Sequence, residues 1–148
     1  MMKIARALWV GAAIVMATAP AVHAAEFTVN MLNMSPKGMF QFDPDFLRVK
    51  PGDTVHFVAK DKGHDVVSIP DMIPDGAEPF KGEMNKDVTV TLTKEGVYGV
   101  ECRPHYAMGM VALIVVGDPS SNLEKAKAIK QPGKAKQVFA KLFEQISK

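Results

Sequence analysis

The stretch Gly96-Val-Tyr-Gly-Val-Glu-Cys-Arg-Pro-His-Tyr-Ala-Met-Gly-Met-Val-Ala-Leu-Ile-Val-Val116 decides the fold of this chain. Its two ends, residues 96–101 and 110–116, are rich in β-branched and apolar residues, which favour β-strands. Pro104 and Gly109 lie between them and mark a turn. The pattern therefore predicts two strands joined by a short loop, and this loop and the first residue of the second strand carry a thiol, an imidazole and two thioethers.

These loop side chains offer the donor atoms of a copper site. Cys102 is the only cysteine, so it forms no disulfide within the chain. A thiolate, two imidazoles and a weakly bound thioether are typical of a blue-copper electron-transfer site. The loop supplies Cys102, His105 and a methionine. Spacing leaves Met108 and Met110 both open as the thioether ligand, although Met110 begins an apolar strand and is better placed to point inward.

The second imidazole must come from elsewhere, and two histidines compete for that role. His64 follows a glycine at a turn and precedes two valines, so its ring can face inward where a strand starts. His56 lies within residues 54–58, where it alternates with Val55 and Phe57, so it is expected on the outward face of a strand. The sequence favours His64 as the ligand.

From Glu26 to Val116 the chain consists of short strand-like segments separated by turn residues. This spacing is typical of a β-sandwich or barrel. The segment from Pro70 to Pro79 contains too many prolines for regular structure and is expected to be a loop. The predicted strands are residues 27–32, 46–50, 54–58, 65–69, 88–92, 96–101 and 110–116.

After Pro119 the composition changes to residues that favour helices. A first helix is predicted up to Lys130, with Ser120 or Ser121 as its cap, and Gln131-Pro-Gly133 ends it. A second helix follows, with apolar residues on one face and charged residues on the other. We expect the helical tail to pack on the sandwich through this apolar face, which comprises Val138, Phe139, Leu142, Phe143 and Ile146.

The N-terminus reads as a secretory signal peptide. A basic start and an apolar run over residues 7–19 precede small residues that indicate cleavage after Ala24. The predicted organisation is a signal peptide, residues 1–24, followed by one domain, residues 25–148. No later segment is apolar over the roughly 20 residues that a membrane-spanning helix needs.

Removal of the signal peptide changes the charge balance. The whole chain has 18 Lys and Arg against 16 Asp and Glu, and Lys3 and Arg6 leave with the signal. The remaining 16 basic and 16 acidic residues cancel, so any steering of a partner must come from the distribution of charge. We expect no nucleic-acid partner.

These residues closely resemble the pseudoazurins, a family of small blue-copper proteins in the cupredoxin superfamily. The loop Cys-x2-His-x4-Met is shared with plastocyanins, but two helices after the last strand are typical of pseudoazurins. The resemblance covers almost the whole chain after the signal. Its matching segments are Ala25-Glu-Phe-Thr-Val-Asn-Met-Leu-Asn33, Val49-Lys-Pro-Gly-Asp-Thr-Val55, Asp61-Lys-Gly-His64, Met72-Ile-Pro-Asp-Gly-Ala77 and residues 96–111.

The resemblance implies a mainly β, eight-stranded Greek-key cupredoxin sandwich with two C-terminal helices packed on it. It also implies one type 1 copper ion, bound by His64, Cys102, His105 and Met110. The resemblance further implies a periplasmic one-electron carrier and not an enzyme. Such a carrier docks transiently to redox proteins such as copper nitrite reductase, cytochrome c peroxidase or c-type cytochromes, and we expect a monomer without a membrane span. The alternative function is a copper(I) storage or delivery protein.

One position departs from the family pattern. Asp65 follows the first histidine ligand, where the family usually has an asparagine that ties the ligand loops together by hydrogen bonds. An ionised carboxylate cannot donate such bonds. The reduction potential and rigidity of this site therefore depend on the hydrogen bonds that Asp65 makes.

A docking surface is expected around the exposed ligand, His105. Apolar residues would form a flat patch there, and lysines would surround it and attract an acidic partner. The expected patch residues are Met39, Pro44, Pro104 and Met108, and the expected lysines are Lys37, Lys62, Lys81, Lys134 and Lys136.

Overall fold

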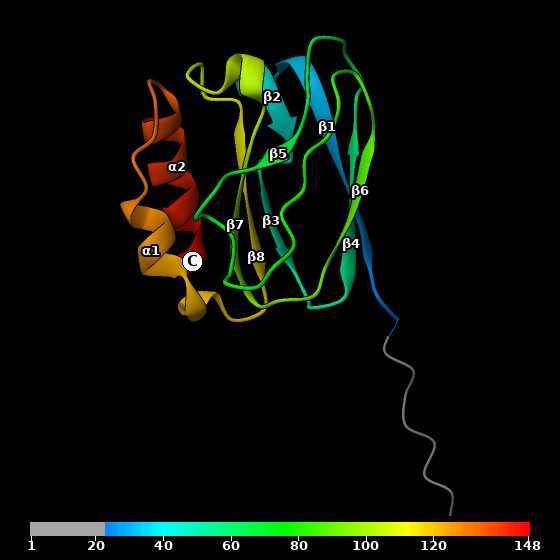
Figure 1. Ribbon diagram of the computed structural model, residues 1–148. Helices are drawn as coiled ribbons and strands as arrows, with labels where there is room; N and C mark the ends of the chain where they lie inside the picture. Colours follow the sequence, from blue (N-terminus) through cyan, green and yellow to red (C-terminus); the bar gives the residue numbers. More distant parts are fainter. Residues whose placement is uncertain (1–22) are drawn as a thin grey trace, which may run out of the picture.

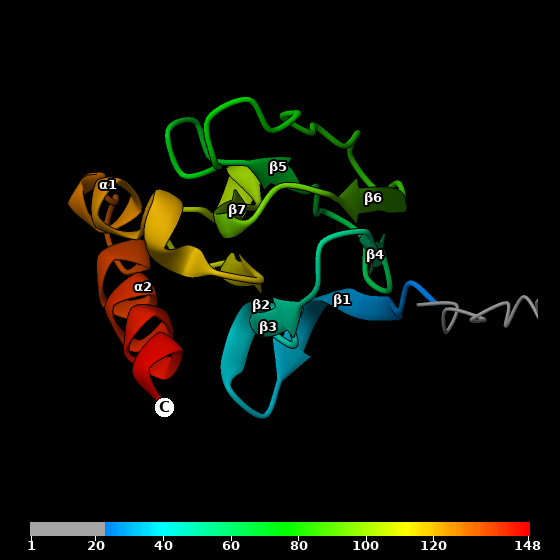
Figure 2. The same cartoon turned by 90° about the horizontal axis from the view of Figure 1, so that it is seen from below.

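The computed structural model describes residues 23–148, so the predicted signal peptide lies outside the described residues except for His23 and Ala24. The described chain forms two four-stranded β-sheets packed face to face. Two C-terminal helices cover the outer face of one sheet, as Figure 1 and Figure 2 show from two directions. The predicted mainly β, eight-stranded sandwich with two helices is confirmed.

Strand pairing within the sheets is mixed. The first sheet has the order β2-β1-β4-β6 and the second β3-β8-β7-β5. β1 pairs in parallel with β4, and β3 in parallel with β8, whereas β1–β2, β4–β6, β5–β7 and β7–β8 are antiparallel. The strands are β1 (Glu26–Ser35), β2 (Gly38–Asp43), β3 (Phe46–Val49), β4 (Asp53–Val58), β5 (Val67–Ser68), β6 (Val88–Leu92), β7 (Gly96–Glu101) and β8 (Val111–Val116).

β8 is buried on both faces, which explains its continuous apolar sequence. Because side chains alternate along a strand, Ala112 and Ile114 belong to the core between the two sheets. Leu113 and Val115 belong to a second cluster, which lies under the helices. The molecule therefore has two apolar layers, one on each side of β8.

Helices α1 (Leu123–Ala128) and α2 (Ala135–Glu144) form the outer layer, and α2 packs on β8. The predicted apolar face of α2 is confirmed, since Phe139 and Leu142 are fully buried. No helix within residues 23–148 combines the length and apolar character that crossing a bilayer requires.

The predicted cap of the first helix is wrong. Ser120 and Ser121 lie in a separate 3₁₀ turn, and Asn122 is the residue that precedes α1. The Asn122 side chain does not cap α1 either. Its Oδ1 accepts a hydrogen bond from the Val97 backbone N–H at 2.8 Å, and its Nδ2 donates to the Val97 carbonyl at 2.8 Å. Asn122 therefore anchors the helical tail to β7.

Two strands differ from the sequence-based assignment. β2 was not predicted, and the cause is visible at Phe40, whose φ of 54° interrupts the regular alternation. The segment predicted as a strand over residues 65–69 pairs only at Val67 and Ser68. Asp65 is excluded from β5 because its side chain bonds to Arg103 of a neighbouring loop.

Candidate metal centre

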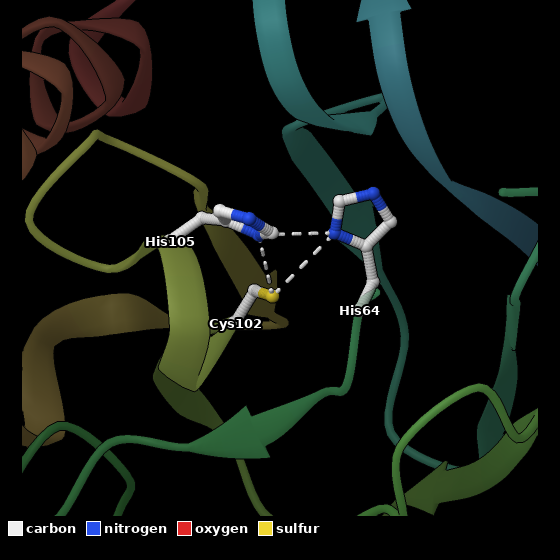
Figure 3. Close-up of side chains that lie close together, drawn as sticks. All are labelled: His64, Cys102 and His105. Carbon is white, nitrogen blue, oxygen red and sulfur yellow. Dashed lines mark hydrogen bonds between the residues drawn. The ribbon is translucent and has the colours of Figure 1, made fainter. Parts of the chain in front are cut away.

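Three ligand atoms converge at one end of the sandwich. Nδ1 of His64, Nδ1 of His105 and Sγ of Cys102 lie within 4.8 Å of one another. Figure 3 shows the three side chains pointing toward a common point, His64 from one side and Cys102 and His105 from the other. His56 is not part of this group, because its ring lies outward on β4, as the strand pattern predicts, and contacts Thr89.

The fold explains why these side chains meet. His64 lies in the connection between β4 and β5, and Cys102 directly follows β7. His105 ends a 3₁₀ turn, Arg103–His105, and Pro104 near its start fixes the backbone without removing a needed hydrogen-bond donor. The His105 backbone N–H donates to the Cys102 carbonyl at 3.1 Å, which keeps the two ligand residues on one rigid turn.

The separations fit a metal ion. Sγ of Cys102 lies 3.7 Å from Nδ1 of His64 and 3.6 Å from Nδ1 of His105, and the two Nδ1 atoms are 3.2 Å apart. A triangle with these sides has a circumradius of about 2.0 Å, which is close to metal–nitrogen and metal–thiolate bond lengths of about 2.0–2.3 Å. His64, Cys102 and His105 could therefore hold one metal ion without rearrangement of the protein.

Met110 and Met108 have opposite environments. Met110 is fully buried and belongs to the same core cluster as Cys102, whereas Met108 is 49% exposed. The Met110 backbone is also tied to the site, because its N–H donates to the His105 carbonyl and its carbonyl accepts from the Cys102 N–H, each at 3.1 Å. The predicted inward position of Met110 and surface position of Met108 are confirmed.

His64 has a hydrogen-bond partner that the sequence did not reveal. Its Nε2 lies 2.9 Å from Oδ1 of Asn33, an acceptor, so Nε2 carries the proton and donates. This bond leaves the lone pair on Nδ1, the atom that faces Cys102. Asn33 therefore selects the tautomer that can bind a metal.

Phe40 contacts the other imidazole of the site, that of His105. The two rings are stacked, with centroids 3.9 Å apart and planes 11° from parallel. Phe40 needs a left-handed backbone, φ 54°, to reach this position, and such a conformation is uncommon for a bulky residue. Asn33 and Phe40 lie opposite each other in the β1–β2 hairpin, between the paired positions Leu32–Gln41 and Met34–Met39. The hairpin thus contacts both imidazoles.

Asp65 also joins the two ligand loops, in a way that differs from the pattern expected from the resemblance. Its side chain is fully buried and accepts two hydrogen bonds from Arg103. The Arg103 backbone N–H donates to Oδ1 at 2.8 Å, and the guanidinium Nε donates to Oδ2 at 2.6 Å. The carboxylate therefore links the loops as an acceptor, where the family asparagine is expected to donate.

Burial determines the protonation of the ligand atoms without a metal. Burial raises the pKa of the Cys102 thiol to about 11, although backbone N–H groups of Asp65 and His105 act in the opposite direction. The pKa of His64 is lowered, first by burial and then by the nearby His105. At neutral pH the site therefore holds a thiol and a neutral His64 imidazole, and metal binding must remove the thiol proton.

The helical tail supports the back of the ligand loop. The Tyr106 hydroxyl donates to the Gln131 side chain, and the Lys134 backbone N–H donates to the Ala107 carbonyl at 2.9 Å. Gly133 has a φ of 49°, and a Cβ at this position would lie 2.5 Å from the Ala107 oxygen. A glycine is therefore required where the tail meets the loop.

Exposed methionines gather on parts of the chain near the three ligand atoms. Met39 is 56% exposed and adjoins Phe40, and Met34 is 62% exposed and pairs with Met39 across the hairpin. Met108 belongs to the ligand loop itself. The expected patch residues Pro44 and Pro104 are also exposed. Among the expected lysines, Lys37 forms an ion pair with Asp45, so its charge is partly neutralised.

Known copper-binding proteins resemble this chain in sequence and fold. The model of the copper-binding plastocyanin/azurin family matches residues 29–117. The chain is 47% identical to a pseudoazurin from Methylorubrum extorquens, over 98% of this chain and 99% of that protein. It is 45% identical to a pseudoazurin from Paracoccus pantotrophus, over 85% and 87%. The crystal structure of pseudoazurin from Methylobacterium extorquens AM1 superposes with a TM-score of 0.79 and 49% identity, over 82% of this chain and 98% of that one.

Proposed function

This chain belongs to the pseudoazurins of the copper-binding plastocyanin/azurin family, and from that premise we propose how it carries electrons and where. It is a blue-copper protein, and members of this family are electron carriers rather than enzymes. We propose that His64, Cys102, His105 and Met110 hold the copper ion. The observation that supports this ligand set most strongly is the convergence of two Nδ1 atoms and one Sγ around a point about 2.0 Å from each.

Bound copper supplies a one-electron redox couple, and the protein residues supply its rigid surroundings. The stacked Phe40 ring and the short 3₁₀ turn hold His105 in one orientation. Asn33 does the same for His64. Two well-held imidazoles would keep one geometry in both oxidation states, so little reorganisation would accompany electron transfer.

The half-buried His105 is the proposed route for the electron. Exposed Met39 and Met108 would contact a partner around it, and thioether side chains adapt to differently shaped surfaces. A small, weakly bound interface suits a shuttle that must dissociate quickly. We propose copper nitrite reductase, cytochrome c peroxidase or c-type cytochromes as transient partners of a monomeric carrier, with lysines such as Lys62 and Lys134 attracting acidic surfaces.

The proposed location is the periplasm. Cleavage of the predicted signal peptide after Ala24 would leave residues 25–148 as the working domain. Mass spectrometry of the exported protein tests this, since a mature chain that does not begin at Ala25 would contradict the proposed processing.

The visible spectrum after addition of copper(II) to the apoprotein tests the ligand set. We expect an intense thiolate-to-copper charge-transfer band that Cys102→Ser abolishes. Met110→Leu should change the band and the reduction potential, whereas the matched variant Met108→Leu, at an exposed position, should change neither. A colourless protein that binds copper(I) tightly would instead favour storage or delivery.

A further inference from the structure

The buried carboxylate of Asp65 has one charged partner, Arg103, among the ion pairs found within residues 23–148. Asp65 follows His64 in sequence, and Arg103 follows Cys102, so each member of the pair adjoins a proposed ligand. The Asp65 side chain is 0% exposed, whereas the Arg103 side chain is 44% exposed. The positive charge therefore reaches inward from the surface to a negative charge in the interior.

The two hydrogen bonds of this pair place different demands on residue 65. Any acceptor oxygen could receive the Arg103 backbone N–H at Oδ1. The bond from the guanidinium Nε requires a second acceptor at Oδ2, which a carboxylate provides. An asparagine would place its NH₂ group or its oxygen there, but not two acceptors. The acid and the arginine are therefore chemically matched.

A buried charge without its partner is costly, because the interior screens charge poorly. The same weak screening makes a charge next to the ligands act on the metal. A lone carboxylate there would favour the more positive copper(II), and a lone guanidinium would favour copper(I). Together they form a unit of zero net charge.

We propose that Asp65 and Arg103 are positioning residues that act as one neutral unit, locking the two ligand loops together and balancing the potential at the copper. This inference rests on the proposed ligand set. It predicts opposite effects of the two single neutral substitutions on the reduction potential. A purely structural link predicts the same direction for both, because each would loosen the same junction.

The test uses Asp65→Asn, Arg103→Gln and the double variant, which replace charge with neutral groups of similar shape. Spectroelectrochemical titration of the copper-loaded proteins measures the reduction potential. At a fixed applied potential, Arg103→Gln should raise the copper(II)/copper(I) ratio at least threefold. This change corresponds to a reduction potential that is lower by about 28 mV, at 59 mV per tenfold change in the ratio. Asp65→Asn should lower the ratio at least threefold, and the double variant should lie within twofold of the unmodified protein.

Arg103→Lys is the control for charge, because it keeps the cation without the Nε geometry. Its potential should lie closer to that of the unmodified protein than the potential of Arg103→Gln does. Single variants that shift the potential in the same direction, or that leave it unchanged, would overturn the electrostatic balance.

Denaturant unfolding of the metal-free proteins tests the lock independently of the ligand assignment. The double variant should lose less stability than the two single variants combined, by at least fivefold in the folding equilibrium constant. Additive losses of stability would contradict the proposed link between the two ligand loops. If the protein failed to bind copper, this double-mutant cycle would still measure the coupling between Asp65 and Arg103. Failure of the proposed function and failure of this inference are therefore distinguishable.

Discussion

Copper binding should release a proton from Cys102, and the pH dependence of affinity measures it. Without metal, burial raises the pKa of this thiol to about 11. The metal-bound form needs the thiolate, so below that pKa each unit of pH should raise the affinity about tenfold. The pKa of His64 is lowered from its ordinary value, so at pH 7 and above His64 binds copper without releasing a proton.

The expected affinity for copper(I) therefore rises about a thousandfold between pH 7 and pH 10, with no plateau in this range. Anaerobic competition with a copper(I) chelator of known, pH-independent affinity measures it, and the reduced ion avoids oxidation of the thiol. Cys102→Ser is the control, and its affinity should change little over the same range.

The shape of the curve separates this expectation from its alternatives. A thiol with an ordinary pKa of about 8.5 would give a plateau above that pH. A thiolate preformed at neutral pH would give no rise at all. Either result would refute the argument that burial controls the ionisation of Cys102 in the apoprotein.

Three further predictions concern residues that support the ligands. Phe40→Leu should lower the free energy of unfolding of the apoprotein by about 1 kcal/mol relative to Phe40→Tyr, which retains the stack on His105; equal values in denaturant titrations would contradict a role for stacking. Asn33→Ala should weaken copper binding about fivefold, because the buried His64 imidazole loses its hydrogen-bond acceptor, which water can only partly replace. Asn33→Asp keeps an acceptor and should not weaken binding; competition with a chelator measures both variants. Gly133→Ala and Gly52→Ala both place a side chain at a positive φ, but only the former meets the ligand loop, so only Gly133→Ala should alter the visible band of the copper protein.

Most of the sandwich could be predicted because its strands either alternate between apolar and polar residues, as β4 does, or are continuously apolar, as β8 is. β4 is the plainest case, since Val55 and Phe57 are buried and His56 is not. β2 escaped prediction because the left-handed backbone of Phe40 breaks that periodicity. Local pattern also misled at the first helix, where a long-range bond to Val97 decides the role of Asn122.

In the candidate site, the proposed ligands could be predicted from the sequence, but the residues that support them could not. Cys102 and His105 stand out because they share a short loop, and His64 because it follows a turn. Asn33 and Phe40 carried no signal, since their contacts with the imidazoles depend on how a distant hairpin folds over the loop. The pairing of Asp65 with Arg103 was equally hidden, although the presence of an acid at residue 65 marked the position as unusual.

The support that the helical tail gives to residues 106–109 bears on the order of events during synthesis. All four proposed ligands have been translated once the ribosome passes residue 110, but Gln131 and Lys134, which hold the loop from behind, come later. In a nascent polypeptide of this length, the loop that carries the donor atoms would lack the contacts of the helical tail. Stable insertion of the ion should therefore wait until the segment up to Lys134 has been made and has packed behind the loop.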